Sequence, residues 1–456
     1  MNNASFSPGC VAPFIPESFY PPRGGDVAGR LCTTFTQDAS ATSCCLPCPT
    51  TYWVWSDSFF WHALIANYIS IISLVCHCFL LLTFALIPEE KSHRHYLSIG
   101  LTVSFILIAI AFIIPLGTKP EFCYNDITPH DLHTDRSCAA TGAIVEAGAM
   151  GAVVWILLRS IWTALRIMIN FKRVEIFKKI SIAVGVGVPL ILLAVSLPVT
   201  GVSYRLGNVC IPNHASALPT WFAWIFIFGS SSWIIQVVTV LYCVWKFAKF
   251  SFSAGPSHST AVSQSSINTD LAAAAPDSDQ AKKRLTLYRR KRVAWRKVRD
   301  VLALQWRSII MAFIVANLTV YFGVMFMQQL AASRAGIKTE DPDSPIFIWK
   351  ACLIANNGDK IKCLKGRSNL LGMSEARAVG SLTLASCVGI FVFLLMVRSS
   401  MFVGWWQLLR NPRQAFRRPS VDSQDLIMHN RREAETVEAE KPEDEDGVRR
   451  ASASAA

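Results

Sequence analysis

The sequence is poor in charged residues. Asp, Glu, Lys and Arg make up 16% of it, whereas about 25% is usual for a soluble domain. Hydrophobic residues account for 52%, and the mean hydropathy is positive. This composition excludes an ordinary soluble protein and indicates a protein that crosses a membrane several times. The formal net charge of +13 is not a nucleic-acid signal here, because its distribution follows the membrane topology described below.

Signatures of common enzymes are also missing. The chain has no Walker loop, no His-Glu-x-x-His and no Gly-x-Ser-x-Gly. We therefore expect neither an enzyme nor a bound cofactor or metal. A cleavable signal peptide is missing too, because the first 50 residues lack a basic start followed by an apolar stretch. The first membrane span is thus expected to export the N-terminal tail itself.

Long apolar runs are what the chain does have. A helix needs about 20 apolar residues to span a bilayer, and seven runs meet this requirement. The predicted fold is an all-α bundle of seven transmembrane helices. The spans are placed near 63–87, 96–116, 139–168, 180–200, 219–245, 306–329 and 377–397.

The charge between the spans predicts their orientation. Cytoplasmic loops are enriched in Lys and Arg. The loop between spans three and four is basic, and the loop between spans five and six carries the run 282–299. The loop 117–138 is acidic on balance, whereas the basic residues of 330–376 lie in a long loop, where the rule weakens. These loops place the N-terminus outside and the C-terminus inside. The basic residues of the first of these loops are Lys172, Arg173, Lys178 and Lys179.

The cysteines divide in agreement with this topology. Four of the 14 fall inside spans (Cys76, Cys78, Cys243 and Cys387), and the long cytoplasmic loop and the tail contain none. An oxidising exterior and a reducing cytosol produce this division. The other ten fall on the predicted outer side and allow five disulfides: Cys10, Cys32, Cys44, Cys45, Cys48, Cys123, Cys138, Cys210, Cys352 and Cys363.

Three of these cysteines crowd into the segment SCCLPCP at 43–49. A zinc site at Cys45-x-x-Cys48 would need a second ligand pair at similar spacing, which is not evident. A thioredoxin-like site would need a βαβ context, which is missing. A disulfide knot that braces a short, Pro-rich outer tail is the favoured interpretation.

The chain divides into parts of different composition. Within the membrane region, a Ser-, Ala- and Pro-rich insert is predicted to be disordered. An apolar stripe among Arg and Lys at 285–305 predicts a basic amphipathic helix, and 402–416 predicts a short helix on the inner membrane face. The predicted parts are an outer Cys- and Pro-rich tail at 1–62, the seven spans at 63–400, the insert at 250–281 and a cytoplasmic tail at 402–456.

Several segments carry a resemblance to a known family. They are CCLPCP before span one, QVVTVLYC in span five, LQWRSI at the start of span six, IWKACLIANNGDKIKC in the last outer loop and VRSSMFVGWW after span seven. These segments resemble fungal seven-span G-protein-coupled receptors. That group is similar to the Frizzled/Smoothened and secretin-type (family 2) classes and to the cyclic-AMP receptors. The resemblance covers roughly 44–410.

The chain departs from other receptor classes. It lacks an Asp-Arg-Tyr at the end of span three and an Asn-Pro-x-x-Tyr in span seven, unlike rhodopsin-type receptors. Its N-terminal tail is also too short for a full Frizzled cysteine-rich domain.

The resemblance implies a disulfide between Cys138, at the start of span three, and Cys210, before span five. It also implies a resting-state contact at the base of span six, between Arg307 and Trp405 or Trp406. A cation over an indole face is attractive by about 0.5–2 kcal/mol. The alternative for Arg307 is a generic anchor at the membrane interface.

Charged residues inside spans are candidate functional residues, because they are costly at bilayer depth. Glu146 in span three could meet a cationic or hydrogen-bonding ligand, the alternative being a structural hydrogen bond to a neighbouring helix. Arg159 and Arg166 share a helix face near the cytoplasmic end. They, with Lys172 and Arg173, are candidates for G-protein coupling. Snorkelling of the arginines toward lipid headgroups is the alternative.

Three sites of covalent modification are predicted outside the spans. Asn3 begins the sequon Asn-Ala-Ser, and Ser420 and Ser452 each follow two arginines in a pattern that basophilic kinases recognise.

Taken together, the sequence features predict a receptor that lies in the lipid bilayer of the plasma membrane, senses an extracellular ligand and activates a heterotrimeric G protein. A transporter or channel is the alternative, although the chain shows no internal repeat and no discontinuous span pair.

Overall fold

The structure is a computed structural model, and it describes residues 10–34, 42–88, 92, 95–169, 171, 173–214, 216–252, 306–331, 345–363 and 373–410. The described residues form two compact units. The first contains Met1–Leu82 and His95–Val397, and the second contains Thr83–Arg94 and Arg398–Ala456. Each unit is treated separately below.

The seven predicted spans are confirmed as seven long apolar helices in the described chain. Each boundary lies within a few residues of the predicted one, except that the fourth helix begins earlier, at Val174, and the fifth ends later, at Phe252. The helices are α2 (Phe59–Leu86), α4 (Tyr96–Thr118), α5 (Arg136–Ala164) with its continuation η3 (Leu165–Ile169), α6 (Val174–Val199), η4 (Leu218–Phe222) leading into α7 (Ala223–Phe252), the helix Trp306–Ala331, and α10 (Glu375–Met396).

Helix α5 lies at the centre of the first unit. It packs against α4, α6 and α7, and 67% of its most apolar stretch is buried, compared with 22–44% in the other spans. Asp135 starts this helix as its N-cap, because its carboxylate accepts hydrogen bonds from the backbone N–H groups of Ser137 and Cys138. The central position explains how a span that contains both Glu146 and Arg159 is accommodated.

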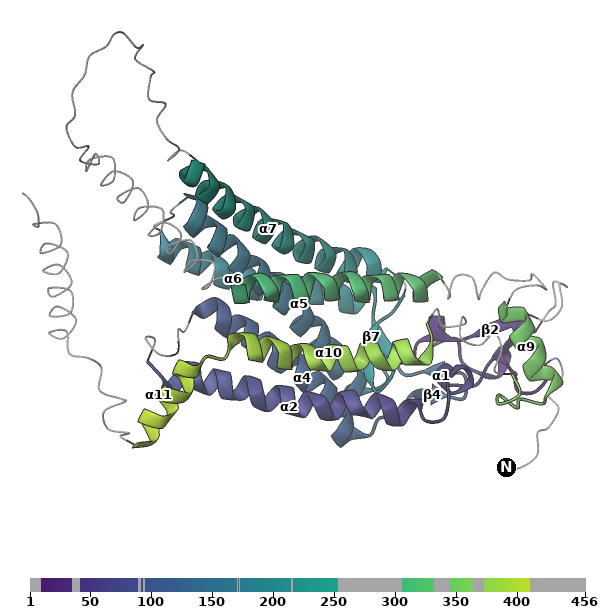
Figure 1. Cartoon of the computed structure of the whole chain (residues 1–456). Helices are drawn as coiled ribbons and strands as arrows, with labels where there is room; N and C mark the ends of the chain where they lie inside the picture. Colours follow the sequence, from purple (N-terminus) through teal and green to yellow (C-terminus); the bar gives the residue numbers. More distant parts are fainter. Residues whose placement is uncertain are drawn as a thin grey trace, which may run out of the picture. The chain divides into compact units, whose positions relative to one another are not determined.

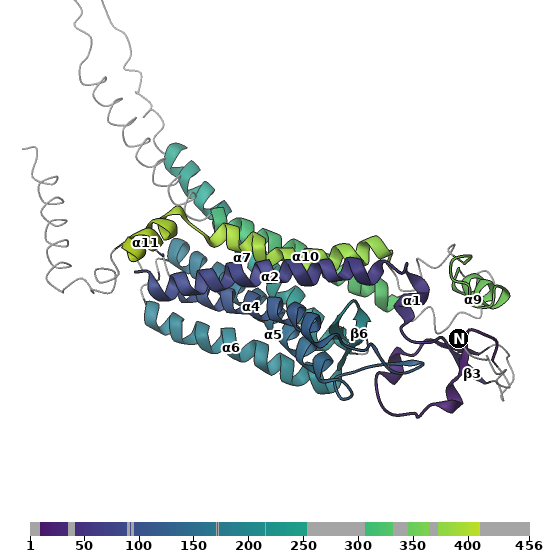
Figure 2. The same ribbon diagram turned by 90° about the horizontal axis from the view of Figure 1, so that it is seen from below.

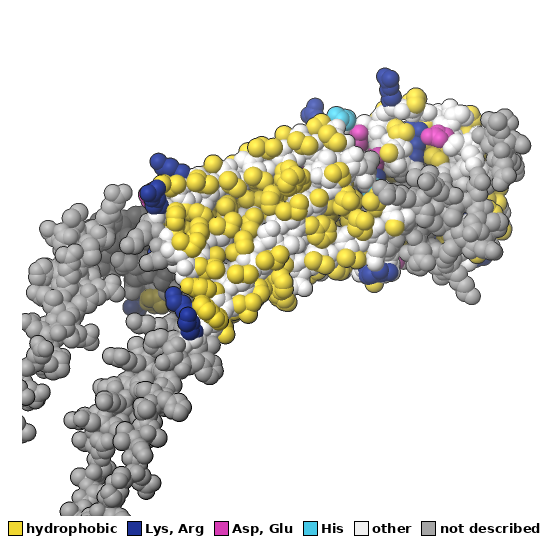
Figure 3. Space-filling view, turned by 90° about the horizontal axis from the view of Figure 1, so that it is seen from above, with side chains coloured by type: hydrophobic (Ala, Val, Ile, Leu, Met, Phe, Trp, Pro, Cys, Tyr) yellow, Lys and Arg dark blue, Asp and Glu magenta, His cyan; other side chains and the backbone are white. Residues whose placement is uncertain are grey.

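The lipid-facing character of the helices is visible on the surface. On the face shown in Figure 3, hydrophobic side chains cover the middle of the helices, and Lys and Arg side chains gather toward their ends. Such a band is what a bilayer requires, because hydrocarbon cannot solvate charge. Helix α6 likewise exposes apolar side chains, among them Leu190 and Ile191.

In the described residues, three small antiparallel sheets supplement the helices, and none of them was predicted from the sequence. Their pairing orders are β1-β3-β2, β4-β5 and β6-β7. Figures 1 and 2 show the N-terminal strands beyond one end of the helices, together with α9 (Pro345–Ala355). The strands are β1 (Ile15–Pro16), β2 (Cys32–Thr34), β3 (Ser43–Cys45), β4 (Cys123–Asn125), β5 (Thr128–Pro129), β6 (Val202–Leu206) and β7 (Val209–Pro212).

The described part of the N-terminal tail shares a buried core with the helices. Phe14 and Trp55 of the tail belong to the same buried cluster as Trp349 and Leu353 of α9 and Leu382 of α10. The short helices α1 (Thr50–Val54), η1 (Glu17–Phe19) and η2 (Val27–Gly29) complete the tail. The tail is therefore an integrated cap on the bundle.

The described part of the second unit includes the helix α11 (Ser399–Arg410), in the region where the sequence predicted a helix at 402–416. Within this unit, the Trp405 indole donates a hydrogen bond of 2.9 Å to the Thr83 hydroxyl at the end of α2. Gly404 lies against Ile87, where a Cβ would come within 2.9 Å of the Ile87 side chain. The end of α2 and α11 thus pack together.

Candidate functional site

Five disulfides tie the tail, the loops and the helices together at one end of the bundle, which we call the cystine end. All ten cysteines that the sequence placed outside the spans take part, and the four free cysteines lie in α2, α7 and α10. Cys138, at the start of α5, is bonded to Cys210 of β7. The other pairs are Cys10–Cys44, Cys32–Cys45, Cys48–Cys123 and Cys352–Cys363.

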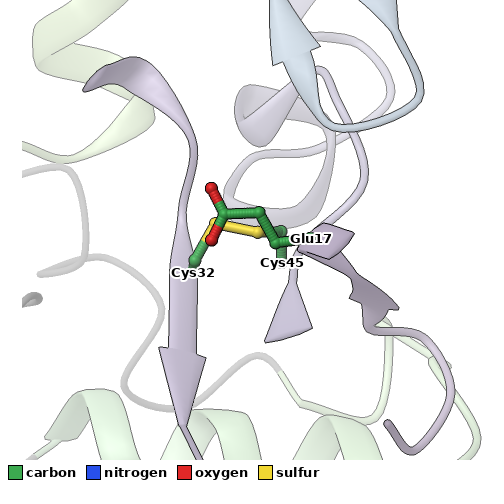
Figure 4. A group of neighbouring side chains, drawn as sticks. All are labelled: Glu17, Cys32 and Cys45. Atoms are coloured by element: carbon green, nitrogen blue, oxygen red, sulfur yellow. A yellow bond between two sulfur atoms is a disulfide. The ribbon is translucent and has the colours of Figure 1, made fainter. Parts of the chain in front are cut away.

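The crowded segment 43–49 sends its three cysteines in three directions. Cys44 reaches back to Cys10, Cys45 to Cys32 on the neighbouring strand, and Cys48 forward to Cys123 of β4. Figure 4 shows Glu17 beside the Cys32–Cys45 bond. Although these three side chains cluster as metal ligands would, the two sulfurs are bonded to each other, so neither is a thiolate. Cys45 and Cys48 sit in separate disulfides and do not form a ligand pair.

A two-stranded hairpin at the cystine end covers the interior of the bundle. Strands β6 and β7 are joined by Gly207 and Asn208, and Gly207 has a φ of 71°, which favours glycine. The hairpin is bonded to α5 through Cys138–Cys210. At the start of α5, the hydroxyl of Tyr204 donates to the carboxylate of Asp135 at 2.6 Å.

A buried ion pair joins this hairpin to the N-terminal tail. Asp26 accepts hydrogen bonds from Ser203 at 2.8 Å and from Arg205 at 3.4 Å. The Asp26 side chain is 4% exposed and that of Arg205 18%. Arg205 also donates to Nδ1 of His214, whose ring lies against Phe326 of the sixth span. Burial and the positive charge of Arg205 lower the pKa of His214 to about 3.

Beneath the hairpin lies a cavity of about 260 Å³. Its walls come from α4, α5, η4, α7, the helix Trp306–Ala331 and α10, and the hairpin contributes Leu206, Ile211 and Pro212. The lining is mostly aliphatic and aromatic, which is typical of pockets for small molecules. Among the described residues that line it, Glu146 alone is ionisable.

Glu146 is the polar feature of this cavity. It lies ten residues after the first residue of α5, a rise of roughly 15 Å, and it is 1% exposed. Neither carboxylate oxygen makes a hydrogen bond of normal geometry with a described residue. The Ser196 hydroxyl of α6 interacts with it, although outside that geometry. The structural hydrogen bond that was the alternative for Glu146 is thus incomplete.

The predicted coupling residues lie at the opposite end of the helices. Arg159 is half-buried and donates to the Ser98 hydroxyl of α4 at 3.2 Å. Arg166 is exposed and its guanidinium lies 5.5 Å from the centre of the Trp162 ring. Arg173 is also exposed. Burial, together with the charges of Arg159 and Arg166, lowers the pKa of His95 to about 4.

Arg307 contacts the end of the seventh span. Its Nη1 donates to the backbone carbonyls of Val397 at 2.8 Å and Leu395 at 3.4 Å, beyond and within the last turn of α10. A cation at a helix C-terminus satisfies carbonyls that have no partner within the helix. We call this contact the Arg307 clasp. These carbonyl partners could not be predicted from the sequence, because every residue has a backbone carbonyl and no residue type marks the ones that accept.

The tryptophans expected beside Arg307 belong to the second unit, whereas Arg307 lies in the first. Trp405 is half-buried and bonded to Thr83, and Trp406 is exposed with the Arg410 guanidinium 4.8 Å from its ring centre. Arg307 itself lies 5.5 Å from the ring centre of its neighbour Trp306. The pairing of Arg307 with Trp405 or Trp406 stays a prediction.

Other predicted features lie outside the described residues. They are the sequon at Asn3, Lys172, the phosphorylation sites Ser420 and Ser452, the insert at 250–281 and the amphipathic segment at 285–305.

Comparison with known proteins places this architecture in a family. Residues 60–264 match the family described as 7 transmembrane receptor (Secretin family). The chain is 34% identical over 413 residues to the G protein-coupled receptor gprM of Aspergillus fumigatus, which covers 90% of this chain and 78% of the relative. The structure of squid rhodopsin aligns with 80% of this chain and 89% of the rhodopsin chain, at 10% identity and a TM-score of 0.39. This match is too loose to establish a shared fold by itself.

More distant relatives come from a slime mould. Frizzled and smoothened-like protein K of Dictyostelium discoideum is 25% identical over 199 residues, which cover 42% of this chain and 33% of that protein. Protein B of the same series is 24% identical over 46% of this chain and 32% of its own length. The chain thus spans about a third of these relatives. None of the comparisons supports a transporter or channel. With seven apolar helices and a relative of this identity and coverage, the chain belongs to the G-protein-coupled receptors and is a multi-pass plasma-membrane protein.

Proposed function

We propose that this receptor is inserted with the cystine end outside the cell and the opposite end in the cytoplasm. The disulfide-bonded cysteines support this orientation, since all ten lie at one end, where an oxidising exterior preserves disulfides. The basic loop that contains Arg173 supports it as well, because it lies at the other end.

The ligand binds in the cavity beneath the β6–β7 hairpin. The observation that carries this proposal is the buried carboxylate of Glu146, which lines a mostly apolar cavity and lacks a hydrogen bond of normal geometry to the described residues. A polar group in this state is costly for folding and is retained where function needs it. The cavity is bounded by the fifth, sixth and seventh spans, so an occupant contacts the helices whose packing changes on activation.

The Arg307 clasp holds the resting state. A hydrogen bond from a charged donor contributes about 1.5–3 kcal/mol, which is the scale of the bias between two receptor conformations. Ligand binding repacks the sixth and seventh spans and releases the clasp. The cytoplasmic ends then separate and admit a heterotrimeric G protein, which contacts Arg159, Arg166, Lys172 and Arg173 at this end.

Regulation by kinases is part of the proposal. Phosphate at Ser420 or Ser452 would add a charge of about −1.5 to −2 to the basic surroundings of each site. Such a change alters which cytoplasmic partners the tail attracts.

The proposal is tested by proximity between the C-terminal tail and each Gα subunit of the host in native membranes. We expect one subunit to give a signal that a non-hydrolysable GTP analogue abolishes, because nucleotide exchange releases the G protein. A signal that persists unchanged with the analogue, for every subunit, would contradict coupling. Lys178→Ala serves as a control that leaves the signal unchanged, because Lys178 is exposed on the surface of α6.

A further inference from the structure

The walls of the cavity select a class of ligand, an inference that rests on the proposed function. We propose that the receptor binds a largely apolar molecule that carries one basic nitrogen, with the protonated nitrogen at Glu146 and the apolar part among the aromatic rings.

The first argument is the state of the carboxylate. Glu146 is 1% exposed and lies among side chains that are nearly all apolar. Arg205, the cation of the covering hairpin, is paired with Asp26 and does not line the cavity. A buried carboxylate without a counter-charge is unfavourable, and a cation that enters the cavity removes this cost by pairing with it. An anionic ligand would increase the cost.

The second argument is the aromatic lining. Ring faces carry negative partial charge and attract cations. An aromatic wall therefore favours the same charge that the carboxylate favours, and its rings also bury the apolar part of the ligand. The aromatic residues of the lining are Phe105, Phe112, Trp221, Phe222, Phe322 and Phe326.

The third argument concerns the size and the sparse polarity of the site. A cavity of about 260 Å³ lies just below the range of about 300–1,000 Å³ that is usual for drug-sized ligands. Apart from Glu146, the lining offers few polar side chains, such as Thr319, Gln329 and Ser381. A sugar, a peptide or a nucleotide needs many more partners, whereas a small amine with one hydrocarbon or aromatic arm does not.

The test uses phenylalkylamines of increasing chain length, each matched to the phenylalkanol that carries a hydroxyl in place of the amine. The full-length receptor is placed in lipid nanodiscs, and the dissociation constant is taken from the concentration dependence of the melting temperature. We expect at least one amine to bind saturably and at least about ten-fold more tightly than its alcohol. Glu146→Gln should lower the affinity of the receptor for that amine by about ten- to a hundred-fold, because it removes a charge-assisted hydrogen bond.

Three controls keep the result specific. The alcohols should lose much less affinity than the amines in Glu146→Gln, since glutamine keeps the shape and still accepts a hydrogen bond through its carbonyl oxygen. Glu146→Asp should retain the preference for the amine, because it keeps the charge. Thr239→Val, which removes a buried hydroxyl of α7 that does not line the cavity, should leave the ratio of amine to alcohol affinity unchanged.

The proposal is overturned if no amine of the series binds, if the alcohols bind as tightly as the amines, or if Glu146→Gln leaves amine affinity unchanged. Nucleotide exchange on Gα, measured in the same nanodiscs, separates this failure from that of the proposed function. Exchange without amine binding overturns the ligand class alone. Amine binding that depends on Glu146, without exchange on any Gα, overturns G-protein coupling and leaves the ligand class standing.

Discussion

At the scale of single residues, the buried pair of Asp26 and Arg205 joins the N-terminal tail to the hairpin over the cavity. We expect Asp26→Asn to lower the free energy of unfolding by about 3–5 kcal/mol, because it leaves the Arg205 guanidinium buried without a counter-charge. Thermal unfolding of the purified receptor measures this. Asp359→Asn is the matched control, since its partner Lys362 is 66% exposed and water screens such a pair, so its loss should change the free energy of unfolding far less. Equal losses in the two variants would contradict this role for the buried pair.

His214, which is bonded to the same hairpin, makes the stability of the folded receptor depend on pH. In the folded receptor its Nδ1 accepts a hydrogen bond from Arg205, and its pKa is lowered to about 3, whereas an unfolded histidine has a pKa of about 6.5. The unfolded state therefore binds a proton first as the pH falls. The contribution of His214 is fully present above about pH 6.5 and is lost between about pH 6.5 and 3, by at most about 1.4 kcal/mol per pH unit.

We therefore expect acidification from neutral pH to about pH 5 to lower the melting temperature of the receptor. His214→Gln, which cannot take up a proton, should reduce that slope. Because His95 also has a lowered pKa, part of the slope should remain in this variant and become smaller still when His95→Gln is added. A slope that is unchanged by His214→Gln would contradict the neutral state of this side chain.

At the scale of elements, three helices meet at one tryptophan. Trp155 of α5 lies between Gly100 of α4 and Gly185 of α6, where an added Cβ would come within 2.3 Å and 2.5 Å of the ring. We expect Gly185→Ala to destabilise the bundle by about 1–3 kcal/mol, because the ring is rigid and the core is full. Gly187→Ala, two residues away with nothing within 4 Å, should be neutral or slightly stabilising. Thermal unfolding of the two variants measures the difference.

A second substitution tests the cause of that difference. Trp155→Leu should restore much of the stability of Gly185→Ala, because the smaller side chain leaves room for the methyl group. Equal stability of Gly185→Ala and Gly187→Ala would contradict the close packing of Gly185 against Trp155.

The disulfide between Cys138 and Cys210 is the other link between elements near the cavity. It closes a loop with a sequence separation of 72. We expect replacement of both cysteines by serine to cost about 2–4 kcal/mol, and to reduce the receptor at the cell surface. Cys387→Ser, at a free cysteine of α10, is the control and should have little effect. Full surface expression and unchanged melting of the double variant would contradict a structural role.

The helices were predictable from the sequence because hydrocarbon imposes one simple demand. Each span is a long apolar run, and the boundaries of α4 and α10 lie within two residues of the predicted ones. The strands were not predicted, since pieces of two to five residues carry no periodicity. One signal was present, because Gly207-Asn208 between short apolar runs is a hairpin pattern.

The candidate site was only partly predictable, and for a similar reason. Glu146 stood out because charge is rare in a span. Asp26, Arg205 and His214 did not, because a charged residue in a loop is ordinary until a partner from a distant segment buries it. The disulfide partners of the tail were open as well, since sequence alone does not fix connectivity.

At the scale of the whole molecule, the structure connects a capped cavity at one end of the bundle to a clasp at the other. The tail, the hairpin and α9 share a buried core with the helices at the cystine end, and a disulfide bonds the hairpin to α5. The sixth and seventh spans line the cavity, and Arg307 joins the same two spans at the opposite end. A change in the cavity is thereby linked to the opposite ends of the sixth and seventh spans through two continuous helices.

The central claim is that the Arg307 clasp restrains the receptor, and the most direct test is GTP-analogue binding to Gα without ligand. Arg377→Ala is the matched control, because Arg377 of α10 bonds to Gln328 of the sixth span at the cystine end. Loss of about 1.5–3 kcal/mol from the resting state raises the active population by about ten- to a hundred-fold while that population is small. We predict that Arg307→Ala raises basal exchange at least several-fold and Arg377→Ala does not. Unchanged exchange in Arg307→Ala, or an equal rise in both variants, would contradict the account.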